Sequence, residues 1–175
     1  MSEINNIILI GPMGAGKTTI GRQIAKKLGK QFYDSDHEIE QRTGADIPWI
    51  FEIEGEDGFR KRESQVLAEL VTQDNIVLST GGGAVLKQEN REALSNNGFI
   101  IYLQSSPEKL YKRTAGDKRR PLLQGDDRLA QIKKILKERE QYYKSLSNKI
   151  INTDKLTVKQ IVREIVKIIE KHEDH

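Results

Sequence analysis

Short apolar runs alternate with longer amphipathic stretches along the whole chain. Five runs are rich in apolar or aromatic residues, as is typical of buried strands, and they span residues 7–10, 31–33, 76–79, 99–103 and 149–152. At least one helical pattern separates each run from the next, which favours βαβ crossovers and a parallel sheet with helices on both faces. The pattern therefore predicts an α/β fold.

Several predicted helices carry a recognisable start signal. Ser106 precedes Pro107, which predicts an N-cap followed by proline at the first helical position. Thr157 and Gln160 fit a capping box ahead of an amphipathic helix near the carboxyl end. An apolar stripe also predicts a helix over residues 18–28, directly after the first strand.

Two stretches interrupt this alternation. The first is helical and spans about residues 37–73, and the second, about residues 115–127, is rich in Gly, Asp, Lys and Arg. A long polar loop in a compact domain is usually functional and often closes over a substrate. We expect a single domain over residues 1–175, with a substrate-binding insertion at 37–73 and a lid at 115–127.

Composition restricts the chemistry that this chain can perform. The 175 residues suit one domain and include no cysteine, so thiol nucleophiles, thiolate metal sites and disulfides are excluded. The first residues lack a targeting signal, and no apolar run approaches the length of a membrane span. We expect a soluble, cytoplasmic protein without a membrane partner.

Positive charge is concentrated in one segment, although the net charge is only +3. Residues 109–144 hold twelve Lys or Arg against five Asp or Glu. This segment is either a solvated helical face or a mobile basic element that closes over polyphosphate. Nucleic-acid binding is disfavoured, because aromatic residues make up only 6% of the chain and are not interleaved with the basic runs as in single-strand-binding proteins.

A phosphate-binding motif follows the first predicted strand. Residues 11–18 spell G-x-x-x-x-G-K-[ST], between that strand and the first predicted helix. The glycines allow a tight turn that aims backbone N–H groups at phosphate oxygens, Lys17 can reach the β and γ oxygens, and the Thr18 hydroxyl can ligate Mg²⁺. A glycine-rich turn without a ligand is the alternative, but the context favours binding of a nucleoside triphosphate.

Two carboxylates, Asp34 and Asp36, follow the second predicted strand. Positions i and i+2 of an extended segment project to the same side, so both can face the phosphate loop across the carboxyl edge of the sheet. One could help to hold Mg²⁺ while the other contacts an acceptor hydroxyl. The alternative is an Asx-turn and helix N-cap, since a helical pattern begins at His37.

Three further features suggest a pocket for an anion. Glu63 lies on an otherwise apolar helical stripe with Arg60 within reach, which is either a structural ion pair or an oriented guanidinium. Three consecutive glycines, residues 81–83, follow the third strand and leave room for a small ligand. Arg139 continues the apolar stripe of a helix predicted over residues 127–147, where it either meets an anion or snorkels to solvent.

Taken together, these motifs resemble the shikimate kinase family in order and spacing. The resemblance runs from Ile7 to about Ile169 and covers GPMGAGKT at 11–18, Asp34-x-Asp36, Thr43-Gly44, G-E-x-x-F-R-x-x-E at 55–63, the triple glycine, Arg120-Pro121-Leu122-Leu123 and Arg139-x-x-x-Tyr143. It implies a P-loop, nucleoside-monophosphate-kinase-like three-layer sandwich with five parallel strands in the order 2-3-1-4-5. It also implies transfer of the γ-phosphoryl group of ATP to the 3-hydroxyl of shikimate.

The resemblance also assigns a nucleotide half to the site. The residues that would wrap the phosphates of ATP are Gly14, Ala15, Gly16, Lys17, Thr18 and Thr19. Thr18 and Asp34 would hold Mg²⁺, the latter through water. Arg120 would meet the transferring phosphate, Arg113 would lie against the adenine, and residues 152–155 would border the base.

The acceptor half follows in the same way. Arg60 and Arg139 would take the substrate carboxylate, the ring would lie against Gly81, Gly82 and Gly83, and Asp36 would bind the accepting hydroxyl. The catalytic residues would then be Lys17, Asp36 and Arg120. The departures from the family are local: Glu140 and Gln141 follow Arg139 where a proline is common, and Ser145 replaces an acid.

The sequence disfavours two other functions. Another small-molecule kinase of the same fold, such as a gluconate kinase, is disfavoured by the motif at 55–63 and by the triple glycine. A GTP-dependent regulatory module would need an N-K-x-D motif, but Asn148-Lys149 is followed by Ile151 at the aspartate position. We expect a monomer whose partners are shikimate and ATP, and no nucleic acid.

Overall fold

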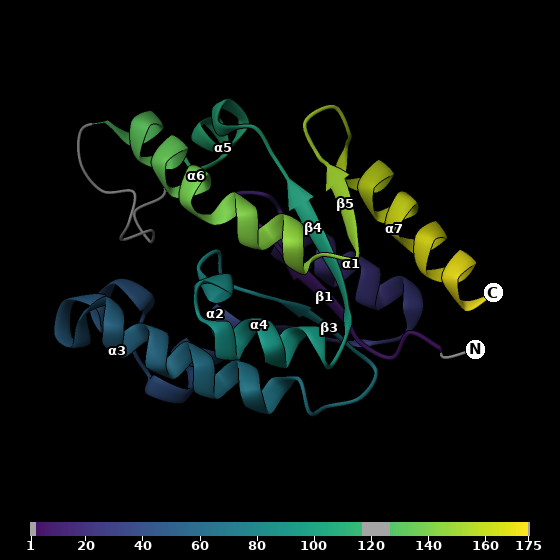
Figure 1. Cartoon of the computed structure of the whole chain (residues 1–175), viewed down its shortest axis with the longest axis horizontal. Coiled ribbons are helices and arrows are strands. Elements are labelled where there is room, and N and C mark those ends of the chain that lie inside the picture. The colour runs from purple at the N-terminus through teal and green to yellow at the C-terminus, as the bar shows by residue number, and fades with distance from the viewer. Residues whose placement is uncertain (1–2, 117–126, 175) are drawn as a thin grey trace.

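The five expected strands form one parallel sheet in the order β2-β3-β1-β4-β5 (Figure 1). The computed structural model describes residues 3–116 and 127–174. The strands are β1 (Ile7–Ile10), β2 (Gln31–Asp34), β3 (Ile76–Ser79), β4 (Phe99–Gln104) and β5 (Lys149–Asn152). The predicted fold class and strand order are confirmed, and no predicted strand boundary is wrong by more than one residue.

Strand β1 lies at the centre of the sheet, where Ile7 is in register with Val77 of β3 and Phe99 of β4. All four β1 residues are at most 1% exposed, which explains why the strand is a continuous apolar run. Strands β2 and β3 lie toward one edge of the sheet from β1, and β4 and β5 lie toward the other edge. The loop after β1 therefore lies at the topological switch point, where open α/β sheets bind ligands.

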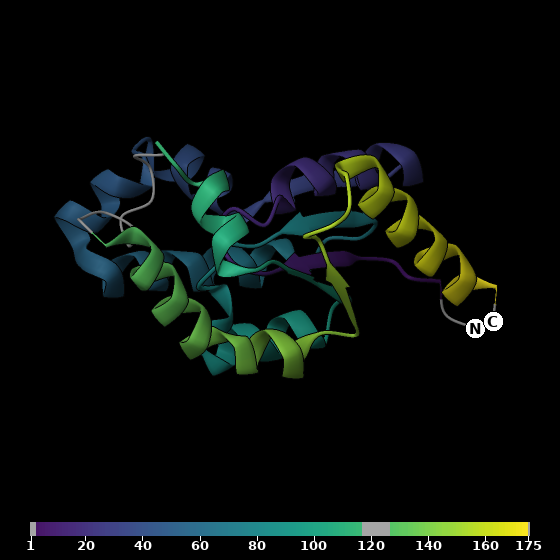
Figure 2. The same cartoon turned by 90° about the horizontal axis from the view of Figure 1, so that it is seen from above.

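Helices cover both faces of the sheet. Their bounds are α1 (Lys17–Leu28), α2 (Ser35–Thr43), α3 (Ile47–Leu70), the 3₁₀ turn η1 (Ala84–Leu86), α4 (Gln88–Ser95), α5 (Pro107–Arg113), α6 (Arg128–Leu146) and α7 (Val158–Glu173). In Figure 2, α1 and α7 lie on one side of the sheet, and α4 and α6 lie on the other.

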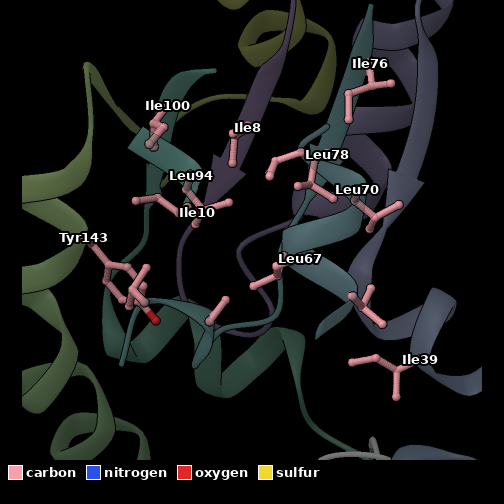
Figure 3. Close-up of a cluster of buried hydrophobic side chains, with 14 of the residues drawn as sticks. Ile8, Ile10, Ile39, Leu67, Leu70, Ile76, Leu78, Leu94, Ile100 and Tyr143 are labelled. Atoms are coloured by element: carbon pink, nitrogen blue, oxygen red, sulfur yellow. The ribbon is translucent and has the colours of Figure 1, made fainter. Parts of the chain in front are cut away.

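The two faces of the sheet pack into two cores. Alternate residues of β1 point to opposite faces, so Ile7 and Leu9 pack with α1 and α7, while Ile8 and Ile10 pack with α3, α4 and α6. Figure 3 shows the second core, in which Leu67 of α3 faces β1 and Tyr143 extends from α6. Tyr143 is fully buried although it carries a hydroxyl group.

The predicted helix starts are confirmed at both capping sites. The Ser106 side chain accepts a hydrogen bond from the Lys109 N–H, and Thr157 forms a complete capping box with Gln160. Helix α2 begins at Ser35, two residues before the predicted start, because the Asp34 carboxylate accepts a hydrogen bond from the His37 N–H and acts as the N-cap.

The two expected insertions differ in how much of each is described. Helices α2 and α3 make up most of residues 37–73, and α3 bends at Gly55, whose φ is 74° and ψ is 177°. Most of residues 115–127 lies outside the described residues, so the expected lid is not described here. Within residues 3–116 and 127–174, no helix has the length and apolar character that crossing a bilayer requires.

Candidate active site

The loop between β1 and α1 has the conformation of a phosphate cradle. Gly14 and Gly16 have φ values of 85° and 95°, which side chains rarely adopt. A Cβ atom at Gly14 would also lie 2.9 Å from Cγ2 of Thr114. The first turn of α1 carries no acidic residue, so its N–H groups and its dipole are available to an anion.

Lys17 lies across this loop. Its Nζ donates hydrogen bonds to the carbonyl oxygens of Gly11 and Pro12, at 2.6 and 2.7 Å, and the residue is only 7% exposed. These bonds hold a positive charge over the space that the loop encloses. The ammonium group is therefore held at the loop that carries the phosphate-binding motif.

Two oxygen donors suitable for a hard cation lie beside the loop. The Thr18 hydroxyl donates a 2.6 Å hydrogen bond to Oδ2 of Asp34, so the first residues of α1 meet the end of β2. Among the described residues there is no cluster of three or more Asp, Glu, His or Cys that could bind a metal alone. This arrangement suits Mg²⁺, which keeps several waters and takes other ligands from substrate phosphates.

Asp36 lies deeper in the same cavity, in the first turn of α2. A Cβ atom at Gly81 would lie 2.7 Å from Oδ1 of Asp36 and 2.9 Å from Oε2 of Glu63, so the two carboxylates flank this glycine. Burial, and after it the charges of Glu63 and Asp34, raise the pKa of Asp36 to about 7, although the charges of Lys17 and Arg60 oppose the shift.

The two aspartates do not lie on one extended segment, as their i, i+2 spacing predicts. Asp34 and Asp36 are not two positions of one extended segment, because Asp34 ends β2 and Asp36 is already helical. The N-cap of the alternative interpretation occurs at Asp34, whose carboxylate accepts a hydrogen bond from the His37 N–H and another from the Thr18 hydroxyl. Both aspartates still line one cavity.

Arg60 and Glu63 form a buried ion pair at 3.0 Å, and Arg60 also contacts Glu56 at 3.4 Å. Glu63 is fully buried, and this burial raises its pKa, while the charge of Arg60 acts in the opposite direction. Within the described part of the chain, Nε of Arg60, Oε2 of Glu63 and Oδ1 of Asp36 are buried without a hydrogen-bond partner. Buried polar atoms without partners around one cavity are typical of a ligand site.

Arg139 reaches this cavity from α6. It is 4% exposed, so it does not snorkel to solvent. A Cβ atom at Gly82 would lie 3.4 Å from its Nη1 and 3.2 Å from the backbone nitrogen of Met13. Gly82 therefore lies between the phosphate loop and Arg139.

Arg113 joins the phosphate loop to the strand on the other side. Its Nη1 donates hydrogen bonds to the Gly14 carbonyl at 3.4 Å and to the Ser105 hydroxyl at 3.3 Å. Ser105 in turn bonds to the Thr153 hydroxyl at 2.6 Å. Residues 152–155, expected to border the base, are thus connected to Arg113.

One cavity of about 530 Å³ contains nearly all the expected site residues. Ala15 does not line the cavity, because it is buried within the loop, and Arg120 lies outside the described residues. The expected residues that line the cavity are Gly14, Gly16, Lys17, Thr18, Thr19, Asp34, Asp36, Arg60, Gly81, Gly82, Gly83, Arg113 and Arg139.

Sequence reasoning missed several residues of this cavity. Phe51 and Phe59 line it as an aromatic pair with ring centroids 4.9 Å apart, and Glu40 lines it from α2. The Ser35 hydroxyl, fully buried behind the cavity, accepts a 3.1 Å hydrogen bond from the Gly81 N–H. Phe59 lies four residues before Glu63 on the same apolar helical stripe and could have been proposed, whereas nothing in the sequence pattern marks Ser35.

The sheet order, the phosphate loop and the adjoining pocket of carboxylates and arginines define a small-molecule kinase of the nucleoside-monophosphate-kinase-like P-loop class. A family model described as shikimate kinase matches residues 13–170. The chain belongs to the shikimate kinase family, and its reaction is the ATP-dependent phosphorylation of shikimate.

Individual relatives agree with this assignment. Shikimate kinase from Nitrosococcus oceani is 53% identical over 95% of this chain and 88% of its own length. The structure of shikimate kinase from Acinetobacter baumannii in complex with shikimate superimposes with a TM-score of 0.94 at 46% identity, over 97% of this chain and 94% of that one. A gluconokinase from Sinorhizobium meliloti shares only the fold, with a TM-score of 0.59 at 15% identity over 98% of this chain and 94% of that one.

Proposed function

We propose that phosphoryl transfer from ATP to the 3-hydroxyl of shikimate takes place in the 530 Å³ cavity, with the expected site residues in the roles that the family resemblance implies. The observation that carries this proposal is the continuity of the cavity from the phosphate loop to the unpartnered polar atoms of Asp36, Arg60 and Glu63. A donor and an acceptor can therefore occupy one continuous cavity.

The nucleotide half binds the phosphates of ATP. The backbone of the loop and the N-terminus of α1 donate hydrogen bonds to phosphate oxygens, and Lys17 turns from the loop carbonyls to the β and γ oxygens. Thr18 would hold Mg²⁺, with Asp34 contributing through water, and the bound ion would neutralise charge on the phosphates. Arg120 would add a second positive charge at the transferring group, and Arg113 would lie against the adenine.

The acceptor half places the hydroxyl in line with the γ-phosphate. Arg60 and Arg139 bind the substrate carboxylate, because both guanidinium groups are buried and line the same cavity. Asp36 accepts a hydrogen bond from the acceptor hydroxyl and takes its proton as the bond to phosphorus forms. Because phosphoryl transfer needs little covalent help, positioning and electrostatic stabilisation supply most of the rate.

The proposal includes the setting in which the enzyme works. We take residues 1–175 as one kinase domain, with residues 37–73 forming the acceptor side and 115–127 the lid. We take the enzyme to be a monomer. The absence of cysteine suits the reducing cytoplasm, and small molecules rather than nucleic acid or membranes are the expected partners.

The decisive experiment measures ADP release with shikimate, gluconate, a nucleoside monophosphate or no acceptor. We expect turnover with shikimate alone, and activity with gluconate alone would overturn the proposal.

The Arg139→Ala variant tests the residue roles separately. It should weaken shikimate binding at least tenfold, because a charged hydrogen bond of about 1.5–3 kcal/mol is lost, and it should leave ATP binding within about twofold. The Lys137→Ala variant, an exposed position on the same helix, is the matched control. An equal loss of affinity for both substrates would contradict the assignment of Arg139 to the carboxylate.

A further inference from the structure

The triple-glycine loop is held from two sides by buried hydroxyl groups. The Ser35 hydroxyl accepts a hydrogen bond from the Gly81 N–H, as described above, and the Tyr143 hydroxyl donates a 2.6 Å hydrogen bond to the Gly82 carbonyl. Tyr143 is 1% exposed and lies on α6, one helical turn after Arg139. Arg139 is close enough to hydrogen bond to the same hydroxyl and, with its charge, partly offsets the effect of burial on the pKa.

The position of Gly82 gives this contact a consequence for the reaction. A Cβ atom at Gly82 would lie 3.2 Å from the backbone nitrogen of Met13 in the phosphate loop and 3.4 Å from Nη1 of Arg139, so Gly82 is next to both. A shift of Gly82 would therefore disturb its packing against both halves of the site. Burial raises the pKa of Tyr143 to about 12, so the hydroxyl remains a donor at any pH at which the enzyme works.

The helix that carries Tyr143 is itself fixed to the sheet by Glu140. This carboxylate accepts a 2.6 Å hydrogen bond from the Tyr102 hydroxyl and a 3.1 Å hydrogen bond from Nε2 of Gln104, two residues on the same face of β4. The ring of Tyr102 stacks on the ring of Tyr143 with centroids 5.0 Å apart. Glu140 is one of the residues at which this chain departs from the usual family pattern.

We propose that Tyr143 is a positioning residue for shikimate: its hydroxyl fixes the Gly82 carbonyl between the phosphate loop and Arg139, while Glu140 holds α6 against β4. This inference rests on the proposed roles of Gly82 and Arg139. Tyr143 does not touch the reacting atoms, so its effect should appear in acceptor binding. ATP binding should not respond, because the phosphate loop keeps its own hydrogen bonds.

The test compares Tyr143→Phe with Tyr142→Phe, which removes the same single oxygen atom from the preceding residue. Tyr142 packs its ring under Arg91, with the Arg91 Cζ 4.4 Å from the ring centroid, and serves as the control. We expect Tyr143→Phe to raise the KM for shikimate about tenfold, which corresponds to roughly 1.4 kcal/mol, and to leave the KM for ATP within about twofold. Tyr142→Phe should change neither constant by more than about twofold.

A second pair of variants keeps the test informative if Tyr143→Phe fails to fold. Glu140→Ala should raise the KM for shikimate about three- to fivefold, and Glu140→Gln should restore most of the loss, because its amide oxygen still accepts from Tyr102. A lower melting temperature with an unchanged KM for shikimate, in Tyr143→Phe or Glu140→Ala, would overturn the inference. An equal rise in the KM for ATP would do the same.

The Arg139→Ala variant separates failure of this inference from failure of the proposed function. If Arg139→Ala weakens shikimate binding and Tyr143→Phe does not, the carboxylate site stands and the positioning role is wrong. If neither variant affects shikimate binding, both the carboxylate site and the inference are rejected. If both variants weaken it, both are supported.

Discussion

Gly81 is the position where the smallest added group should do the most damage to turnover. An alanine Cβ there would lie 2.7 Å from Oδ1 of Asp36 and 2.9 Å from Oε2 of Glu63. Ordinary carbon contacts begin near 3.4 Å, so the two carboxylates must move by about 0.7 and 0.5 Å. The φ of Gly81 is not in the left-handed region, so the damage comes from this contact and not from the backbone.

The size of the loss follows from this displacement. A misplacement of about 1 Å at a catalytic group can cost about a hundredfold in rate, so we expect Gly81→Ala to lower kcat by roughly ten- to a hundredfold. Overpacking should also cost about 1–3 kcal/mol of stability. The KM for ATP should stay within about twofold, because the phosphate loop does not contact this Cβ.

Gly83→Ala provides the contrast, because its Cβ would collide with the guanidinium group of Arg60 and not with Asp36. That variant should raise the KM for shikimate about tenfold and change kcat less. Steady-state rates of ADP release at varied shikimate, with urea unfolding of each variant, separate the two effects. The reasoning is refuted if Gly81→Ala keeps kcat within threefold of the parent, or if the two variants share one kinetic signature.

Two other predictions follow from the same site. Folded Asp36 keeps its proton up to about pH 7 while the unfolded residue loses it near 3.8, so this contribution to stability is fully present below pH 3.8 and is lost as the pH rises through 7. The loss in free energy of unfolding is at most about 4 kcal/mol. Urea unfolding of the nucleotide- and metal-free protein at several pH values should show that Asp36→Asn flattens the dependence of stability on pH and is more stable than the parent at pH 8. An unchanged dependence would contradict the raised pKa of Asp36. Arg113→Ala should raise the KM for ATP several-fold and leave the KM for shikimate unchanged, because Arg113 donates a hydrogen bond to the Gly14 carbonyl. Lys112→Ala, at an exposed neighbouring position, is the control. Equal changes in the two KM values would argue against an adenine-side role for Arg113.

The fold was predictable because its signals are local and agree with one another. The run at β1 is apolar at every position because it is buried on both faces, and that alone places it inside a parallel sheet. Capping signals at Ser106 and Thr157 mark helix starts correctly, since each depends only on neighbouring residues. Strand order depends on pairing between distant segments, so the local pattern does not predict it, and only the family resemblance implied it.

The site was predictable where a charged residue occupies a position that the helix pattern assigns to an apolar one. Arg60, Glu63 and Arg139 are charged residues on buried stripes, and such residues need partners or ligands. Ser35 and Tyr143 break no such rule, because a buried serine or tyrosine is an ordinary core residue until its hydrogen bond is known. Their contacts to Gly81 and Gly82 join segments about 46 and 61 residues apart, and no local pattern records them.

The aspartate pair shows how a correct prediction can rest on an incorrect reason. The i, i+2 spacing predicts one extended segment, but Asp34 ends β2 and caps α2, while Asp36 is already in the helix. The two carboxylates reach one cavity because α2 starts at the carboxyl edge of the sheet, so its first turn and the end of β2 occupy the same place. Asp34 accepts a hydrogen bond from the Thr18 hydroxyl, whereas Asp36 lies near Glu63, and burial together with the charges of Glu63 and Asp34 raises the pKa of Asp36 to about 7. One short turn thus places two identical side chains in different surroundings of one cavity.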